Sequence, residues 1–290
     1  MRNRLPEIFT MAIFVASSLF AVYLAEALIE ISPGIKSTSS TSGISIVFVY
    51  IAVAIAFTFV ILFVARRRRI SILRYVFYVL IAYVTFFVSS ILAAIVSVNI
   101  VEYYVITFAI PVVILVFLLV SNEWYVIDLA GFFLSAGVSA VWGVEIGIWA
   151  AVVFLVAFAI YDYIAVYKTK HMVSLARVAV DESIPLLFVS PSRRNFTMRD
   201  LTFDNRGEQE VLMLGFGDVA LPSILVVSSA VYGISHPLPF IGLPLAGALA
   251  GMAFLFFFNK NRPAPGLPYI NTGAILGFLI AFFMYFPLRP

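Results

Sequence analysis

Nine apolar runs, most of them near 20 residues long, divide this chain and constrain its fold more than any other feature. A helix of about 20 residues crosses the hydrocarbon core of a bilayer. The runs lack the period-2 alternation of barrel strands, and lipid does not tolerate unpaired backbone groups, so each run is expected to be an α-helix. The predicted spans are Ile8–Leu28, Ile44–Val64, Ile72–Val98, Tyr103–Val120, Val126–Val141, Ile146–Tyr167, Leu212–Gly233, Leu238–Phe258 and Pro268–Phe286. We therefore expect an all-α polytopic membrane protein with nine transmembrane helices.

The composition excludes a water-soluble protein. Hydrophobic residues make up 63% of the 290 residues and charged residues only 11%, against about 45–50% and about 25% in ordinary soluble domains. The chain has no cysteine, which excludes a disulfide scaffold and thiol or iron–sulfur chemistry. The lipid bilayer is the expected partner. The basic run Arg66–Arg69 beside a span is read as a topology anchor, and no nucleic-acid binding is expected.

The distribution of positive charge predicts the orientation. With nine spans, 16 of the 18 Lys and Arg residues fall on the side of the N-terminus, and only Lys36 and Arg289 fall on the other. Basic residues concentrate on the cytoplasmic side of membrane proteins. The N-terminus is therefore expected in the cytoplasm and the C-terminus outside the cell membrane. The loop 168–210 is then cytoplasmic, and the Ser/Thr-rich loop 37–42, whose role stays open, is outside.

Several common chemistries lack their residues. The two histidines, His171 and His236, are far apart, and without an H-E-x-x-H pattern or cysteine they predict no metal site. The segment Gly233–His236 lacks the second glycine of a serine-nucleophile turn. No glycine-rich nucleotide-binding pattern is present, so no cofactor is expected.

Two aspartates stand out among the acidic residues. Most acids are expected to reach interfacial water from loops or helix ends, as do Glu26, Glu30, Asp128 and Glu145. Asp162 and Asp218 instead lie within predicted spans, where a carboxylate is expensive and marks a functional site by default. Asp162 lies six residues before Lys168 and Asp218 eight residues after Glu210. These offsets place both carboxyl groups at similar depths, about 9 and 12 Å from the cytoplasmic surface.

A pair of carboxyl groups at one depth predicts acid–base chemistry. In low dielectric the two groups cannot both ionise, so they share a proton and supply one acid and one base at the same pH. That combination hydrolyses a peptide bond with an activated water and without a metal.

Three motifs resemble those of the presenilin and signal peptide peptidase family of intramembrane aspartyl (GxGD) proteases, and most strongly its archaeal members. They are Tyr161-Asp162, Gly215-Phe216-Gly217-Asp218 and Pro265-Gly266-Leu267-Pro268. The resemblance implies a presenilin-like fold, Asp162 and Asp218 as catalytic residues, and the other motif residues as groups that shape the site and contact substrate. Gly266 departs from the family's Pro-Ala-Leu pattern. The implied substrates are transmembrane helical proteins, in an archaeal cell membrane. A homo-oligomer is possible, and partner subunits are not implied.

The motifs also divide the chain. Residues 1–145 are read as a scaffold of helices, and residues 146–290 as the catalytic part, which includes the loop 168–210. Within that loop, the segment Glu210–Leu214 is a candidate for pairing with an extended substrate as a strand. Two alternatives remain open: a proton- or cation-coupled transporter or channel, and a type IV prepilin peptidase-like GxGD protease.

Overall fold

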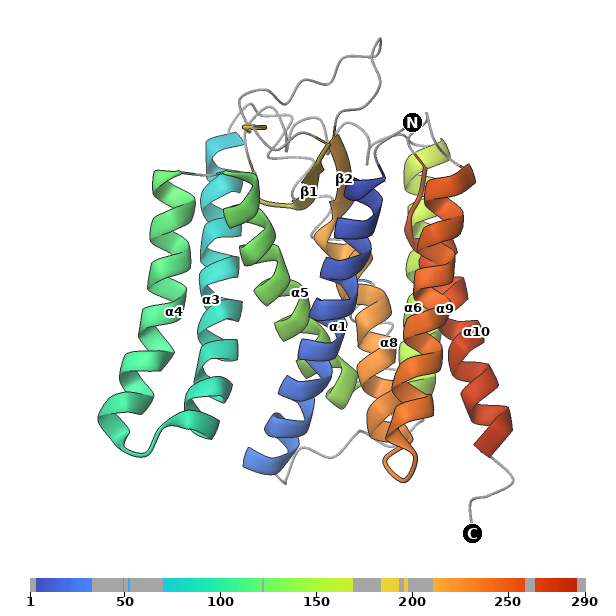
Figure 1. The fold of residues 1–290 in the computed structure, drawn as a ribbon, viewed down its shortest axis with the longest axis horizontal. Helices are drawn as coiled ribbons and strands as arrows, with labels where there is room; N and C mark the ends of the chain where they lie inside the picture. Colours follow the sequence, from blue (N-terminus) through green and yellow to red (C-terminus); the bar gives the residue numbers. More distant parts are fainter. Residues whose placement is uncertain are drawn as a thin grey trace.

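The structure is a computed structural model, and it is a bundle of helices with a small sheet near one end (Figure 1). It describes residues 4–32, 49, 52, 70–121, 123–168, 184–192, 196–197, 211–258 and 264–285. Four features predicted from the sequence lie outside these residues, wholly or for the most part. They are the loop 37–42, the second span Ile44–Val64, the basic run Arg66–Arg69 and the larger part of the loop 168–210.

The described helices match the other predicted spans. Seven of them are long and apolar enough to cross a membrane. Their bounds, with the shorter α8 and a π-helical extension η1 of α6, are α1 Leu5–Ile31, α3 Ile70–Val96, α4 Ile100–Val120, α5 Trp124–Glu145, α6 Ile148–Tyr163, η1 Ile164–Lys168, α8 Phe216–Tyr232, α9 Pro237–Phe258 and α10 Leu267–Tyr285. The two strands are β1 Leu187–Pro191 and β2 Val211–Gly215.

The seventh predicted span begins differently from the expectation. Its first residues, Val211–Gly215, form β2, and the helix α8 begins only at Phe216. A run of large apolar residues suits a buried strand as well as a helix, and hydropathy does not separate the two. Here β1 supplies a pairing partner for the backbone, and Gly215 ends the strand in an extended conformation as the N-cap of α8. The helix expected over Leu212–Gly233 is therefore shorter than predicted.

The two strands pair antiparallel, with Phe188 opposite Leu214 and Val189 opposite Met213. The N–H of Phe216 donates to the carbonyl of Leu186 at 3.1 Å, which identifies a hydrogen-bonded pair. Such pairs alternate with non-hydrogen-bonded pairs along an antiparallel ladder. The N–H groups of Val189 and Met213 therefore point away from the partner strand, toward opposite outer edges of the sheet.

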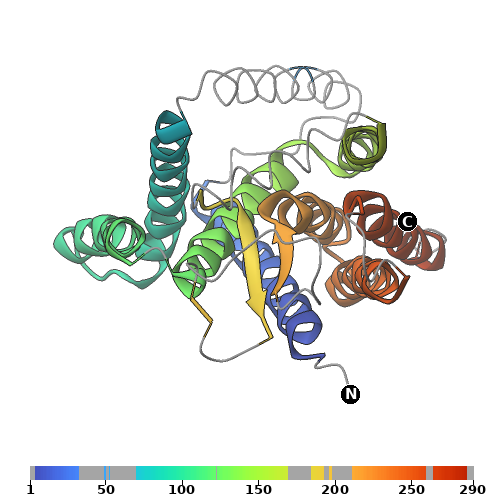
Figure 2. The same ribbon diagram turned by 90° about the horizontal axis from the view of Figure 1, so that it is seen from above.

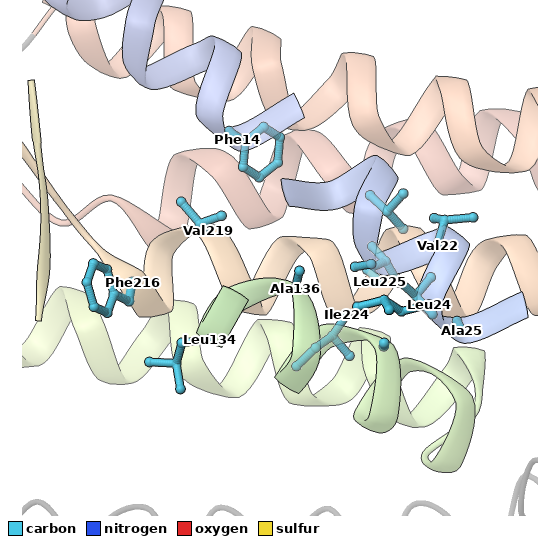
Figure 3. Close-up of a cluster of buried hydrophobic side chains, with 14 of the residues drawn as sticks. Phe14, Val22, Leu24, Ala25, Leu134, Ala136, Phe216, Val219, Ile224 and Leu225 are labelled. Carbon is cyan, nitrogen blue, oxygen red and sulfur yellow. The ribbon is translucent and has the colours of Figure 1, made fainter. Parts of the chain in front are cut away.

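Helix α8 lies in the middle of the bundle, in contact with α1, α5, α6, α9 and α10 (Figures 1 and 2). Close apolar packing holds it there, between side chains of α1 and α5 (Figure 3). The labelled cluster consists of Phe14, Val22, Leu24 and Ala25 from α1, Leu134 and Ala136 from α5, and Phe216, Val219, Ile224 and Leu225 from α8. Since Phe216 and Val219 flank Asp218, this core fixes the position of that residue.

Helices α9 and α10 approach until their backbones touch. A Cβ atom on Gly247 would lie 2.1 Å from the carbonyl oxygen of Gly273, and one on Gly251 would lie 2.2 Å from that of Tyr269. Small residues four apart permit such contact between membrane helices, where van der Waals packing drives association. This contact fixes the start of α10, which follows the segment Pro265–Pro268.

Candidate active site

Asp162 lies near the end of α6, one residue before the last residue of its α-helical part, and its side chain is buried. Its Oδ2 accepts a hydrogen bond of 3.2 Å from the N–H of Leu267. Leu267 is the first residue of α10, so this N–H is one of the groups that the helix itself leaves unpaired. The positive end of the α10 dipole therefore faces the Asp162 carboxyl group.

Asp218 lies in the first turn of α8 and is partly buried. Its Oδ2 accepts a hydrogen bond of 3.2 Å from the N–H of Gly215, as in a capping box. The N–H of Gly215 points to the outer edge of β2, because Gly215 is two residues beyond Met213 in the ladder. The Asp218 carboxyl group therefore lies at the end of that edge.

The segment Pro265–Pro268 brings the two aspartates together. Leu267 donates to Asp162, while a Cβ atom on the neighbouring Gly266 would lie 3.3 Å from both Cγ and Oδ2 of Asp218. Adjacent residues of one segment thus lie beside both carboxyl groups. Glycine in place of the family's alanine leaves the space beside the Asp218 carboxyl group free of a methyl group.

The remaining motif residues fall into different environments. Phe216 is buried against α5, where a Cβ atom on Gly131 would lie 2.2 Å from its ring. Its ring also packs edge-on against that of Phe188, with 4.7 Å between the ring centroids. Gly217 is exposed, and a Cβ atom there would meet nothing within 4 Å. Tyr161 is partly buried, with its ring 6.2 Å from that of Phe158. Phe216 thus anchors the start of α8, and the space beside Asp218 opens at Gly217.

The structure also shows two buried polar residues near this region that the sequence analysis did not identify as important. Asp128 was expected to reach interfacial water, but its side chain is 6% exposed and accepts a hydrogen bond from Val189. Strand β1 packs on α5 at this point and covers Asp128, so its side chain does not reach water. Asn271 of α10 donates to the carbonyl of Leu155 in α6 at 3.0 Å. The only sequence signal for either residue was a polar side chain within an apolar helix.

Comparisons with known proteins identify the family. The family model described as signal-peptide peptidase, presenilin aspartyl protease matches residues 11–286. The chain belongs to this family of intramembrane aspartyl proteases. Two solved structures of a presenilin family intramembrane aspartate protease, in space groups C222 and P2, are similar to it. The first has 28% identity and a TM-score of 0.65, and covers 96% of this chain and 98% of its own. The second has 29% identity and a TM-score of 0.67, and the match covers 98% of this chain and 100% of the solved one.

Membership in the presenilin and signal peptide peptidase family confirms the protease prediction over the transporter alternative. The match covers most of the chain, so the whole bundle has a presenilin-family fold, and the protein is an integral membrane enzyme. A search of curated proteins found no match.

Proposed function

We propose that Asp162 and Asp218 are the catalytic pair of this presenilin-family protease, and that they hydrolyse peptide bonds of transmembrane helical substrates. The observation that carries the proposal is the position of two adjacent residues: Leu267 donates a hydrogen bond to Asp162, and Gly266 lies directly beside the Asp218 carboxyl group. The Asp162 carboxyl group faces the N-terminus of α10, and Asp218 lies in the first turn of α8. The helix dipoles there stabilise the negative charge that the pair carries.

The mechanism uses one water and one shared proton. The ionised carboxyl group takes a proton from water, while the protonated one donates its proton to the carbonyl oxygen of the scissile bond. The hydroxide formed adds to the carbonyl carbon and gives a tetrahedral gem-diol. The first carboxyl group then gives its proton to the amide nitrogen, the C–N bond breaks, and the second regains its proton. The backbone donors from Leu267 and Gly215 hold one oxygen of each aspartate during this exchange.

The substrate is proposed to bind as a strand along β2. A transmembrane helix shields its own peptide bonds, so it must unwind locally before hydrolysis. Val211 and Met213 point their N–H groups to the outer edge of β2, and Asp218 lies at the end of that edge. A peptide added to this edge, as in β-augmentation, leads its backbone toward the aspartates. At the end of this path, Gly266 lies beside Asp218, and the space around Gly217 is open.

The decisive experiment compares wild type with Asp162→Asn and Asp218→Asn after reconstitution with a transmembrane substrate. Each substitution removes an acid–base group, so cleavage is expected to fall by about 10²–10⁴. Glu102→Gln, at the exposed start of α4, is the matched control and keeps wild-type cleavage. If either asparagine variant cleaves at the wild-type rate, the assignment of the catalytic pair is wrong.

The orientation and the number of spans are part of the same proposal. Nine spans with a cytoplasmic N-terminus fit the distribution of 16 and 2 basic residues. In support, the C-terminal end of α1 and the N-terminal end of α3 lie at opposite ends of the bundle (Figure 1). This orientation selects substrate helices whose N-termini lie outside the cell.

Labelling tests the orientation directly, since the chain has no cysteine. An impermeant thiol reagent added outside cells should label Val98→Cys, between α3 and α4, and spare Tyr125→Cys, at the start of α5. Both side chains are exposed. The reverse pattern would overturn the proposed orientation.

The division of the chain is also proposed on functional grounds. Residues 146–290 carry both aspartates and the Pro265–Pro268 segment, while α1 and α5 of residues 1–145 support α8 from the side. We further propose that the protein acts in an archaeal cell membrane without obligatory partner subunits. Cleavage by the purified protein alone tests the second part.

A further inference from the structure

One buried acid in this molecule takes no part in the proposed chemistry. Asp128 lies in the second turn of α5, with its Oδ1 accepting a hydrogen bond of 2.8 Å from the N–H of Val189 in β1. Its Oδ2 is also buried and has no hydrogen-bond partner among the described residues. A buried carboxyl group with one unpaired oxygen is costly, so its presence calls for a physical reason.

The bond from Asp128 reaches the outer edge of β1. The N–H of Val189 points away from β2, as its place in the ladder requires. A two-stranded sheet has two outer edges, and each offers unpaired backbone groups. Asp128 occupies the edge of β1, whereas the edge of β2 leads to Asp218. The carboxyl group therefore fixes the sheet from the side opposite to the proposed substrate path.

Strand β1 connects this bond to the active site. Next to Val189, the Ser190 hydroxyl is 2.7 Å from that of Thr10 in α1. On the other side, the Phe188 ring packs on Phe216, two residues before Asp218. The hydrogen bond from Val189 to Asp128 prevents β1 from sliding along α5. Because β2 is paired with β1 in a fixed register, β2 is then fixed as well. Slippage of a strand changes every pairing in the sheet.

We propose that Asp128 is a positioning residue that fixes the β1–β2 sheet to α5, and thereby determines which peptide bond of the substrate lies at the aspartates. This inference rests on the proposed function, because it assumes that substrate pairs with β2. The role requires a hydrogen-bond acceptor of this length and does not require a charge. Asparagine at position 128 should therefore preserve this role, whereas alanine should not.

The test measures the cleavage positions, KM and kcat of Asp128→Ala and Asp128→Asn on a transmembrane substrate, by mass spectrometry of the products. For Asp128→Ala, we expect additional cleavage positions and a KM about tenfold higher, as for the loss of one buried hydrogen bond. Binding of a hydroxyl-bearing transition-state mimic should stay within about threefold of wild type, since the aspartates are untouched. Asp128→Asn should restore the wild-type cleavage positions.

Two further variants separate positioning from folding. Val189→Pro removes the same hydrogen bond from the donor side, at a position where the N–H does not pair with β2, and should give the same additional cleavage positions. Ser18→Ala removes a buried hydrogen bond of 2.7 Å between α1 and Ser223 of α8. It should lower thermal stability without changing the cleavage positions.

Three outcomes overturn the inference. The first is unchanged cleavage positions and KM in both Asp128→Ala and Val189→Pro. The second is loss of mimic binding in parallel with cleavage. The third is an Asp128→Asn variant that behaves as Asp128→Ala does. The proposed function fails differently, by cleavage that persists in Asp162→Asn or Asp218→Asn, so the two failures are distinguishable.

Discussion

Helices α8 and α4 are both apolar, but the bundle buries them in different ways. In α8, the eight consecutive residues Pro222–Ser229 are all buried. In α4, only Thr107, Pro111, Ile114 and Leu118 are buried, at spacings of three and four residues. That spacing describes one stripe of a helix, so α4 turns a single face to its neighbours and the rest outward. A helix buried on all sides has no such stripe.

The difference shows how this membrane protein builds a site. The central helix carries polar side chains, such as Ser223 and Ser229, that find partners in α1 and α9. Glycines on neighbouring helices make room for it, as Gly143 does for Val227. The peripheral helix α4 needs neither device. Sensitivity to substitution should therefore be high around α8 and low on the outer face of α4.

The largest effect is expected for Gly131→Val, which inserts a side chain where the Phe216 ring lies. A Cβ atom at this position would lie 2.2 Å from the ring, so the start of α8 must move. We expect a loss of stability of about 3 kcal/mol and a loss of cleavage of at least about tenfold, since Asp218 moves too. Thermal unfolding and cleavage assays measure the two effects. Gly242→Val, where a Cβ atom meets nothing within 4 Å, is the control. Equal behaviour of the two variants would refute the argument.

A smaller and more selective effect is expected from proline in the strand before α8. Met213→Pro removes an N–H from the open edge of β2, so cleavage should fall about tenfold through KM, with little change in stability. Leu212→Pro removes an N–H from a pair with Ser190 and should lower the free energy of unfolding as well. Cleavage kinetics and thermal unfolding of both variants check this. A Met213→Pro protein with wild-type KM would show that substrate does not pair with this edge.

Next in size is the contrast between the two glycines beside Asp218. Gly266→Ala places a methyl group 3.3 Å from Cγ of Asp218, so the carboxyl group must shift by a few tenths of an ångström. We expect kcat to fall several-fold, since acid–base catalysis depends on geometry. Gly217→Ala meets nothing within 4 Å and should leave thermal stability unchanged. Steady-state kinetics measure the first effect and thermal unfolding the second. A destabilised Gly217→Ala variant would contradict the open space described there.

The smallest effects are expected in α4. Val113 is 49% exposed and Ile114, its neighbour, is 4% exposed on the buried stripe. Val113→Ala should change stability by less than about 0.5 kcal/mol, whereas Ile114→Ala should cost about 1 kcal/mol or more through lost packing. Neither should change cleavage. If Val113→Ala were the more harmful of the two, the outer face of α4 would be a contact surface.

The sequence predicted most of the helices because lipid imposes one simple rule, that a spanning backbone must satisfy its own hydrogen bonds. The helix predicted from the sequence was wrong at the start of α8, where Val211–Gly215 forms a strand. There the same apolar residues have two ways to pair their backbone, and the choice depends on β1, which is 20 or more positions earlier in the chain. The prediction was also wrong at Asp128, because depth along a helix does not reveal which side chain reaches water.

The sequence by itself determined that this chain is a membrane protein, and it indicated two aspartates through their cost in lipid and their motifs. Those properties depend on residue type and on local spacing. Only the tertiary structure decided that the Pro265–Pro268 segment lies beside both carboxyl groups, that Phe216 is buried in the core while Gly217 borders open space, and that Asp128 bonds to β1. Such contacts join residues far apart in the chain, and they depend on how helices with similar apolar sequences pack against one another.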